Sequence, residues 1–336
     1  MIIDKEKKET VKPERPGGFL DYLPGDFLAR EKMINTISSV FRSFGYNPIE
    51  TPRVEFLKTL SGEESDTGKN IFRILSSNDS EPLAMPFDHT VPFARLLAAN
   101  PYNSKDRSGI RLPWRRMVVG PVFRGEKPQA GRYRQFYQFD ADIAGTDSMM
   151  ADAEIVALIF NTLSALGVKK FLIRINNRKI LNGLAELVEI KTRDKVSKED
   201  ITKELMRILD KVDKIGLEGI VSELQKKPES DFDPAPFLSN EAVLKVRSYL
   251  DIQGSNTERL NKAKNVFSGI KIAEEGIVEL EKIISFLAPL EVPAEFVSID
   301  FSIARGLDYY TGPVMETILL DAKRFGSIFS GGRKIR

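Results

Sequence analysis

The sequence predicts an α+β fold in which an antiparallel sheet is flanked by helices and a helical insertion interrupts the chain. Three observations predict it. Residues 117–145 hold two apolar segments separated by a polar loop of glycines and a proline, a pattern typical of a hairpin. Residues 27–44 and 147–166 carry apolar side chains at helical spacing. Residues 190–290 shift to Lys, Glu and Asp with Leu and Ile at helical spacing, which indicates a separate helical segment.

The first element is the helix over residues 27–44, with Asp26 as its expected N-cap. Gly45 ends this helix, and residues 46–51 form a short strand that stops at Pro52. The elements expected after it are a polar loop and short strand over 60–74, a helix over 91–99, strands over 117–123 and 133–143, a helix over 147–166, a strand over 170–177, a helix over 178–188 and strands from Val297 onward.

Length and composition indicate an ordinary soluble protein of two domains. The chain has 336 residues, of which 42% are hydrophobic and 29% charged. Its formal net charge is only +2, so any contact with nucleic acid must come from a local patch. Residues 111–134 form such a patch, with seven basic residues against the single acid Glu126.

Missing residue types exclude several kinds of chemistry. The chain has no cysteine, which excludes disulfides, thiol nucleophiles and cysteine-bound zinc. Its single histidine, His89, cannot build a serine–histidine triad or a multi-histidine metal site. A reaction without a protein nucleophile, such as phosphoanhydride activation, remains open. The charged residues 1–18 do not form a signal peptide, and no apolar run is long enough for a bilayer, so we expect a cytoplasmic protein.

The returning strand of the hairpin has a polar face. Residues of one parity on this strand are Arg134, Phe136, Gln138, Asp140 and Asp142. A face with a cation, an amide and two carboxylates is expected to line a polar cavity. Clustered arginines in the adjoining loop suggest an anionic ligand beside a cationic one, since guanidinium groups hold phosphates bidentately. Composition alone favours the alternative of a solvated edge hairpin with scattered charges.

The order of these residues gives a family resemblance. The segment FRGEKPQAGRYRQFYQFDADIAG, residues 123–145, closely resembles motif 2 of class II aminoacyl-tRNA synthetases in the version carried by histidyl-tRNA synthetases. RGLDYYTGPVMET, residues 305–317, resembles the segment specific to that family, RGLDYYTGxVFE. The helix and strand over 27–52 resemble motif 1, which implies a homodimer. The resemblance implies a class II synthetase-like fold that activates histidine with ATP and Mg²⁺ and transfers it to tRNA(His).

The resemblance also implies roles for individual residues. Arg124 and Arg305 are the catalytic arginines at the α-phosphate of ATP, and Glu126 and Arg132 complete the ATP-binding set. Residues implied in histidine binding are Asp88, Thr90 and Gln138 for the α-amino and carboxylate ends, Asp142 and Tyr310 for the two imidazole nitrogens, and Tyr309 and Tyr310 as walls of the pocket. No protein-held metal is implied.

The segment around Asp88 also has a second interpretation. From the residues alone, Asp88 is a helix cap for the helix over 91–99. Pro86 and His89 depart from the usual arginine and leucine of the family, which indicates a different local geometry. We expect His89 to be a wall residue and not a catalyst.

The resemblance divides the chain into four parts. Residues 1–16 are expected to be a disordered lead-in, 17–189 the catalytic core with motifs 1 and 2, 190–290 a helical insertion domain, and 291–336 a return to the core. The insertion domain grips the tRNA acceptor stem in the family, whereas its charges alone are those of solvated helix faces.

The resemblance fails at the end of the printed chain. The family continues GGRYD, but here Lys334 follows Gly332 and Arg333, so motif 3 and the anticodon-binding domain lie beyond Arg336. We therefore expect these 336 residues to bind histidine but to form adenylate slowly and to charge tRNA hardly at all.

Two other functions remain open. The first is a non-aminoacylating paralogue, such as the regulatory subunit of ATP phosphoribosyltransferase. Retention of Arg124, Arg305 and the basic hairpin loop argues against it. The second is a non-catalytic nucleic-acid-binding fragment, for which the missing motif 3 argues.

Overall fold

A computed structural model describes residues 12–61, 70–75, 81–103, 105–129, 131–304 and 310–334. The chain divides into two compact units, Met1–Gly145 and Thr146–Arg336. Both contain helices and sheets in which antiparallel pairing predominates, which confirms the predicted α+β class. The predicted domains divide the chain elsewhere, after residues 16, 189 and 290, and they stay a prediction.

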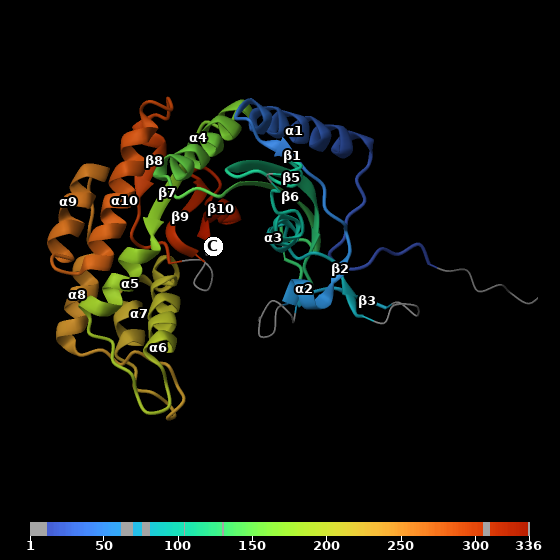
Figure 1. Ribbon diagram of the computed structural model, residues 1–336. Helices are drawn as coiled ribbons and strands as arrows, with labels where there is room; N and C mark the ends of the chain where they lie inside the picture. The colour runs from blue at the N-terminus through green and yellow to red at the C-terminus, as the bar shows by residue number, and fades with distance from the viewer. Residues whose placement is uncertain are drawn as a thin grey trace, which may run out of the picture. The chain divides into compact units, whose positions relative to one another are not determined.

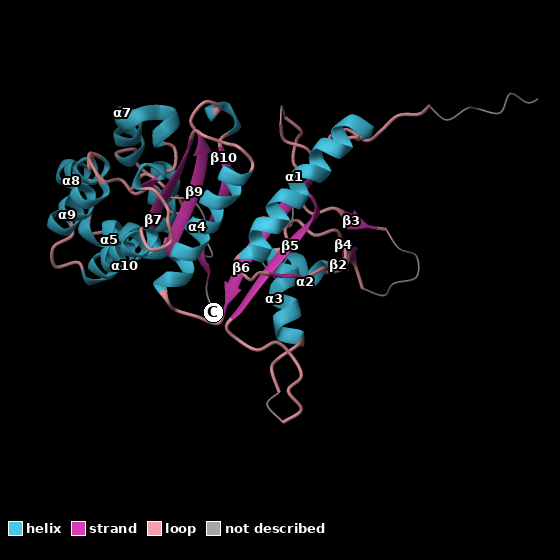
Figure 2. Cartoon of the chain, turned by 90° about the horizontal axis from the view of Figure 1, so that it is seen from above, coloured by secondary structure: helices cyan, strands magenta, loops and turns pink. Residues whose placement is uncertain are grey.

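The first unit is built on a three-stranded sheet in the order β1-β5-β6 (Figures 1 and 2). β5 (Trp114–Phe123) and β6 (Gln135–Ala144) form the predicted antiparallel hairpin, with β5 starting earlier than expected. β1 (Asn47–Pro48) lies parallel to β5 and is shorter than the strand predicted over 46–51. The hairpin therefore supplies most of this sheet.

Helix α1 (Pro24–Ser43) covers one face of the hairpin. The Cζ of Arg30 on this helix lies 4.7 Å from the ring centroid of Tyr137 on β6. The prediction that Asp26 is the N-cap is wrong: Leu23 is the N-cap, because Pro24 already has the φ that a first helical residue needs. Asp26 lies in the first turn, where its charge is favourable to the helix dipole.

A small second sheet and two helices complete this unit. β2 (Glu55–Phe56), β4 (Leu83–Ala84) and β3 (Arg73–Ile74) pair antiparallel in the order β2-β4-β3. α2 (Leu57–Ser61) and α3 (Thr90–Ala99) pack beside this sheet around a cluster of buried side chains. The members of this cluster are Leu60, Ile71 and Ala84, with Leu57, Phe87 and Val91 against them. The cluster fixes the start of α3.

The second unit is built on a four-stranded sheet in the order β10-β9-β7-β8 (Figure 1). Its strands are β7 (Phe171–Asn177), β8 (Val297–Ile299), β9 (Tyr310–Leu319) and β10 (Ser327–Lys334). β9 pairs antiparallel with both β7 and β10, whereas β8 lies parallel to β7. α4 (Met149–Ala165), with eight buried residues, packs on β7 and β10.

Helices α5 (Arg178–Leu187) and α10 (Lys271–Leu287) lie directly against each other (Figure 1). Small residues allow this approach. A Cβ atom on Gly183 would lie 2.5 Å from the Cβ of Ala273, and one on Gly276 would lie 2.9 Å from Ile180. Contacts closer than about 3 Å are not tolerated, so larger side chains here would push the two helices apart.

Helices fill the segment over 190–290, as the sequence predicted. They are α6 (Lys198–Leu209), α7 (Val212–Leu224), α8 (Asn240–Leu250), α9 (Asn256–Val266) and α10, and two short 3₁₀ turns follow at Ala294–Phe296 and Lys323–Phe325. Ser197, Ser239 and Ser255 cap α6, α8 and α9 through their hydroxyl groups. The predicted proline break lies between α7 and α8. Whether these helices act as a separate insertion domain stays a prediction.

Within the described parts of the chain, every helix falls short of the length and apolar character that a membrane span requires.

Candidate functional site

The even-numbered residues of β6 share one face with the even-numbered residues of β5. Pairs that lie directly opposite each other are Arg116 and Asp142, Val118 and Asp140, Gly120 and Gln138, and Val122 and Phe136. After Gln135, every residue of β6 is half-buried. The polar side chains of this face are therefore withdrawn from bulk solvent, which argues against the solvated edge hairpin.

Asp142 is held by a buried arginine. Arg116 is fully buried and forms an ion pair with Asp142, whose side chain is 24% exposed. The Nη2 of Arg116 also donates a hydrogen bond to the carbonyl oxygen of His89, and its Cζ lies 4.3 Å from the ring centroid of Phe93 on α3. The Nη2 makes both polar contacts, and the ring of Phe93 lies against the guanidinium group, whose Nε and Nη1 are buried without a hydrogen-bond partner among the described residues. The ion pair holds the carboxylate of Asp142 beside this group.

Gln138 has an unsatisfied oxygen. Its side-chain Oε1 is buried, and among the described residues it has no hydrogen-bond partner. Leaving a buried acceptor unpaired costs about 1–3 kcal/mol, so a donor from a ligand would be bound favourably there. The resemblance assigns Gln138, Asp88 and Thr90 to the α-amino and carboxylate ends of histidine, and an α-amino group is such a donor.

The start of α3 brings Asp88 and Thr90 to this face. The Oδ1 of Asp88 accepts hydrogen bonds from the backbone N–H groups of Thr90 at 3.0 Å and Val91 at 3.4 Å. Asp88 therefore acts as the helix-capping carboxylate that the residues alone indicated. Its implied contact with an α-amino group, and that of Thr90 with histidine, stay predictions.

His89 is part of the packing between α3 and β5. Its side chain is 2% exposed, and its Nε2 donates a hydrogen bond of 3.2 Å to the carbonyl oxygen of Gly120. Burial lowers the pKa of His89; the bond to Gly120 opposes the shift, while the charges of Arg116 and Arg53 add to it. The ring is consequently neutral at pH 7. That His89 forms a wall of a ligand site stays a prediction.

Arg53 contributes a cation that sequence reasoning missed. A Cβ atom on Gly120 would lie 2.5 Å from the Nη1 of Arg53, so the guanidinium group occupies the space above this glycine. Arg53 also forms an ion pair of 3.1 Å with Glu50.

By sequence alone, Arg116 is only part of the basic patch. The signal that could have found it is an arginine inside an apolar strand, opposite a carboxylate.

Arg124 is the fixed arginine at the end of β5. Its Nε donates a hydrogen bond of 3.2 Å to the carbonyl oxygen of Phe87. The rings of Phe87 and Phe136 lie 4.3 and 5.0 Å from its Cζ. The guanidinium group is thus oriented before any ligand arrives, as a preorganised donor to a phosphate should be.

The hairpin loop carries the remaining predicted ATP-binding residues. Glu126 and Arg132 are exposed, and the backbone of Arg132 pairs with Gln129 in a tight turn. Arg134 anchors the loop, since its Nε donates to the carbonyl oxygen of Glu126 and its backbone N–H donates to Gly18. The loop therefore has a fixed base and exposed charged residues.

The second unit holds the other predicted site residues. Arg305 and Tyr309 lie outside the described residues. Tyr310 begins β9, and a Cβ atom on Gly332 of β10 would lie 2.9 Å from its ring. Because Tyr310 belongs to the second unit, its place in one site with Asp142 stays a prediction.

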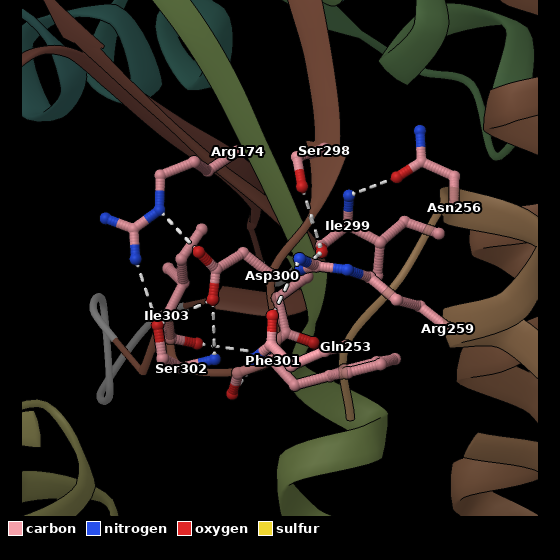
Figure 3. A network of polar contacts seen from close by, with 11 residues as sticks. Arg174, Gln253, Asn256, Arg259, Ser298, Ile299, Asp300, Phe301, Ser302 and Ile303 are labelled. Carbon is pink, nitrogen blue, oxygen red and sulfur yellow. Dashed lines mark hydrogen bonds and ion pairs between the residues drawn. The ribbon is translucent and has the colours of Figure 1, made fainter. Parts of the chain in front are cut away.

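A polar network holds the segment that precedes Arg305 (Figure 3). Arg174 of β7 donates hydrogen bonds to the Oδ2 of Asp300 at 2.7 Å and to the hydroxyl of Ser302 at 2.9 Å. The Oδ1 of Asp300 accepts from the backbone N–H and hydroxyl of Ser302. Burial alone would raise the pKa of Asp300. The charge of Arg174 and the hydrogen bonds from Arg174 and Ser302 outweigh burial and lower the pKa of this carboxyl below its ordinary value.

Helices α8 and α9 hold the same segment from another side. The hydroxyl of Tyr249 donates to the carbonyl oxygen of Phe301 at 2.6 Å. The side-chain amide of Asn256 donates to the carbonyl oxygen of Val297. Its Oδ1 accepts from the backbone N–H of Ile299, and Arg259 donates to the carbonyl oxygen of Ile299 (Figure 3). The backbone over 297–303 is therefore fixed by side chains up to two residues before Arg305.

Solved structures with the same arrangement define the class of protein. The crystal structure of histidyl-tRNA synthetase from Nostoc sp. PCC 7120 superposes with a TM-score of 0.82 at 32% identity, covering 97% of this chain and 69% of that chain. An ATP phosphoribosyltransferase regulatory subunit/histidyl-tRNA synthetase from Bacillus halodurans gives 0.77 at 23% identity, covering 97% and 77%, and so shows the fold alone. The fold is that of class II aminoacyl-tRNA synthetases.

Sequence comparison gives the family. The family model described as histidyl-tRNA synthetase matches residues 18–334. A histidine–tRNA ligase from Clostridium tetani is 38% identical over 330 residues, which span 97% of this chain and 69% of the relative. One from Helicobacter pylori strain J99 is 38% identical over 324 residues, spanning 96% and 69%. The chain belongs to the histidyl-tRNA synthetase family.

Proposed function

We propose that this protein is a histidine–tRNA ligase. The observation that carries the proposal is the half-buried face of β6, where the unsatisfied oxygen of Gln138 lies on the same strand face as a carboxylate fixed by Arg116. The oxygen of Gln138 suits a donor such as an α-amino group, and the carboxylate of Asp142 suits the N–H of an imidazole ring. Relatives named histidine–tRNA ligase, 38% identical, support histidine as the ligand.

The proposed reaction has two steps. A carboxylate oxygen of histidine attacks the α-phosphorus of ATP, the bond to the β-phosphate breaks, and pyrophosphate leaves. A terminal hydroxyl of tRNA(His) then attacks the carbonyl carbon, and AMP leaves. Neither step needs a protein nucleophile, so catalysis consists of positioning and charge stabilisation. Arg124 and Arg305 would stabilise the charge that develops at the α-phosphate, with Glu126 and Arg132 binding ATP.

Mg²⁺ would enter with ATP. Among the described residues, no group of three or more His, Asp or Glu side chains could hold a metal ion. In this proposal the triphosphate oxygens bring the metal, and it would offset their charge. Since tRNA charging serves translation, the proposal includes a cytoplasmic location.

Histidine would be recognised at both ends. Gln138, Asp88 and Thr90 would bind the α-amino and carboxylate groups. Asp142 and Tyr310 would each pair with one imidazole nitrogen, and Tyr309 would form a wall of the pocket. Pairing both nitrogens rejects isosteres, because an analogue that lacks one N–H leaves a buried partner unsatisfied.

Asp142→Ala should weaken histidine binding about 10- to 150-fold. This range corresponds to about 1.5–3 kcal/mol for a lost charge-assisted hydrogen bond that leaves its partner unsatisfied. Titration calorimetry on the folded variant measures it. Asp147→Ala, which removes an exposed carboxylate shortly after β6, is the matched control and should leave affinity unchanged. Equal affinity in Asp142→Ala and the wild type would remove Asp142 from the site.

We also propose that α1 lies at a homodimer interface. It leaves apolar side chains uncovered, because Leu28 is 61% exposed and Met33 is 40% exposed. Leu23, just before the helix, is 71% exposed. Such an interface is expected to bury at least about 2,000 Å² in total. Leu28→Lys should therefore shift the protein toward the monomer in light scattering. Leu244→Lys alters a residue of similar exposure, 62%, on α8 and should not. A monomeric wild type at micromolar concentration would contradict the proposal.

Histidine-dependent exchange of labelled pyrophosphate into ATP tests the function. Exchange with histidine and with no other amino acid is the expected result, at the low rate that the sequence predicts for these 336 residues. Histidine binding with no exchange at all would instead favour a non-aminoacylating paralogue. Binding of tRNA without histidine binding would favour a nucleic-acid-binding fragment. Either outcome would overturn the proposed ligase activity.

A further inference from the structure

The ion pair of Arg116 and Asp142 is balanced in charge. Arg116 has no exposed surface, and a guanidinium group remains protonated in proteins, so its positive charge is permanent. Asp142 lies directly opposite on β6 and retains partial exposure, so its carboxylate can still reach a ligand. The ligand would therefore meet an acceptor oxygen whose charge is already compensated.

Other charged or titratable groups around the pair do not upset this balance. β6 contributes Asp140, two residues along the same face, and the segment after β1 contributes Arg53 above Gly120. The segment before α3 contributes Asp88, which caps the helix, and His89, whose pKa is lowered by burial. Arg95 of α3 pairs with Glu55. Arg53 and Arg95 each have a carboxylate partner of their own, Glu50 and Glu55, and Arg116 is the cation that pairs with Asp142.

A compensated carboxylate distinguishes between the two forms of imidazole. A lone carboxylate in a partly buried site attracts a cation and would favour imidazolium. Here imidazolium would place a second positive charge beside the buried Arg116. Like charges repel strongly where the local dielectric is low. A neutral imidazole avoids that repulsion and still donates one N–H to the carboxylate.

We propose that Arg116 is a positioning residue that makes Asp142 bind histidine with a neutral imidazole ring and reject the imidazolium form. The proposal rests on the proposed function only in taking histidine as the ligand. Arg116 would not touch histidine; it would act through the charge and orientation of Asp142.

Calorimetry in two buffers of different ionisation enthalpy tests this in the wild-type protein. With an imidazole pKa of about 6.5, free histidine is about three-quarters protonated at pH 6.0. Binding of the neutral form must therefore release about three-quarters of a proton per histidine at this pH. Affinity should also fall about tenfold between pH 7.5 and pH 5.5, where the protonated fraction rises from about 0.1 to 0.9. Triazolylalanine, whose ring stays neutral at pH 6, should bind without proton release.

Variants separate the charge of Arg116 from its packing. Arg116→Met leaves Asp142 uncompensated, so histidine should bind as imidazolium with uptake of about a quarter of a proton at pH 6.0. Arg116→Lys keeps the charge and should restore release, although at lower affinity. Arg115→Met deletes a neighbouring charge whose side chain points to the other face of β5. This control should release protons as the wild type does.

The outcomes distinguish this inference from the proposed function. Absence of histidine binding at any pH would overturn the function and the inference with it. Histidine binding by the wild type with proton uptake, or with none, would overturn the inference alone. Weaker binding by Arg116→Met with unchanged proton release would reduce Arg116 to a structural residue. If Arg116→Met does not fold, the wild-type proton release and the Arg116→Lys variant decide the matter.

Discussion

Arg124→Ala is expected to lower the rate of histidine-dependent pyrophosphate exchange about 10²–10³-fold, the usual effect of removing one preorganised donor from a developing charge. The carbonyl oxygen of Phe87 and two aromatic rings orient the guanidinium group. No reorganisation is then needed as the α-phosphate acquires charge. Histidine affinity should change little, because Arg124 acts on the nucleotide.

The controls for Arg124 separate geometry from charge. Arg124→Lys keeps the charge but loses the planar fork, so it should recover only part of the rate. Arg111→Ala removes an exposed arginine of the same basic patch just before β5 and should leave the rate unchanged. An unchanged exchange rate in Arg124→Ala would show that the α-phosphate is held by other residues.

Asp300→Ala should destabilise the protein by about 3 kcal/mol, the lower end of the range for breaking a buried ion pair, because the side chain of Asp300 is 23% exposed. The substitution removes the carboxylate of Asp300 from Arg174 and removes the acceptor for Ser302. Urea unfolding at pH 7 measures the difference. Asp321→Ala breaks an ion pair in which both partners are 67% exposed, and it should cost only about 0–1 kcal/mol.

The effect of Asp300 should depend on pH with a definite sign. Its pKa in the folded protein lies below the ordinary value, so the unfolded chain binds a proton more readily. The stabilisation is therefore complete above the unfolded pKa of about 3.9 and is lost as the pH falls through the lower folded value. The gap between wild type and Asp300→Ala should narrow below about pH 4. A gap that widens in acid would contradict the assigned charge state.

Local signals predicted the elements well. Apolar, β-branched residues between glycines and prolines gave the hairpin of β5 and β6, and helical spacing gave α1, α4 and the helices over 190–290. The N-cap of α1 was wrong because a proline at the start of a helix outweighs an aspartate two residues later. The packing of α10 on α5 joins segments far apart in the sequence, and composition carries no information on such contacts, so the domain limits stay a prediction.

The site was predictable only in part. The parity of β6 gave Gln138 and Asp142 as neighbours on one face, because alternation along a strand is local. The partner of Asp142 depends on the register between two strands, so Arg116 stood in the sequence as one basic residue among seven. The position of Arg53 above a glycine of β5 depends on a contact between segments still farther apart, and no local pattern in the sequence indicates it.

The segment over 297–303 is expected to fold after the strand and the helices that hold it. Its hydrogen bonds to α8 and α9 join residues 40 to 52 positions apart, and those to β7 join residues 125 to 128 positions apart. Closing such long loops costs chain entropy before any bond forms, so contacts of this kind accumulate late. Synthesis on the ribosome gives the same order, because β7, α8 and α9 all emerge before this segment. The segment that leads to Arg305 would therefore assemble on a strand and helices that have already formed.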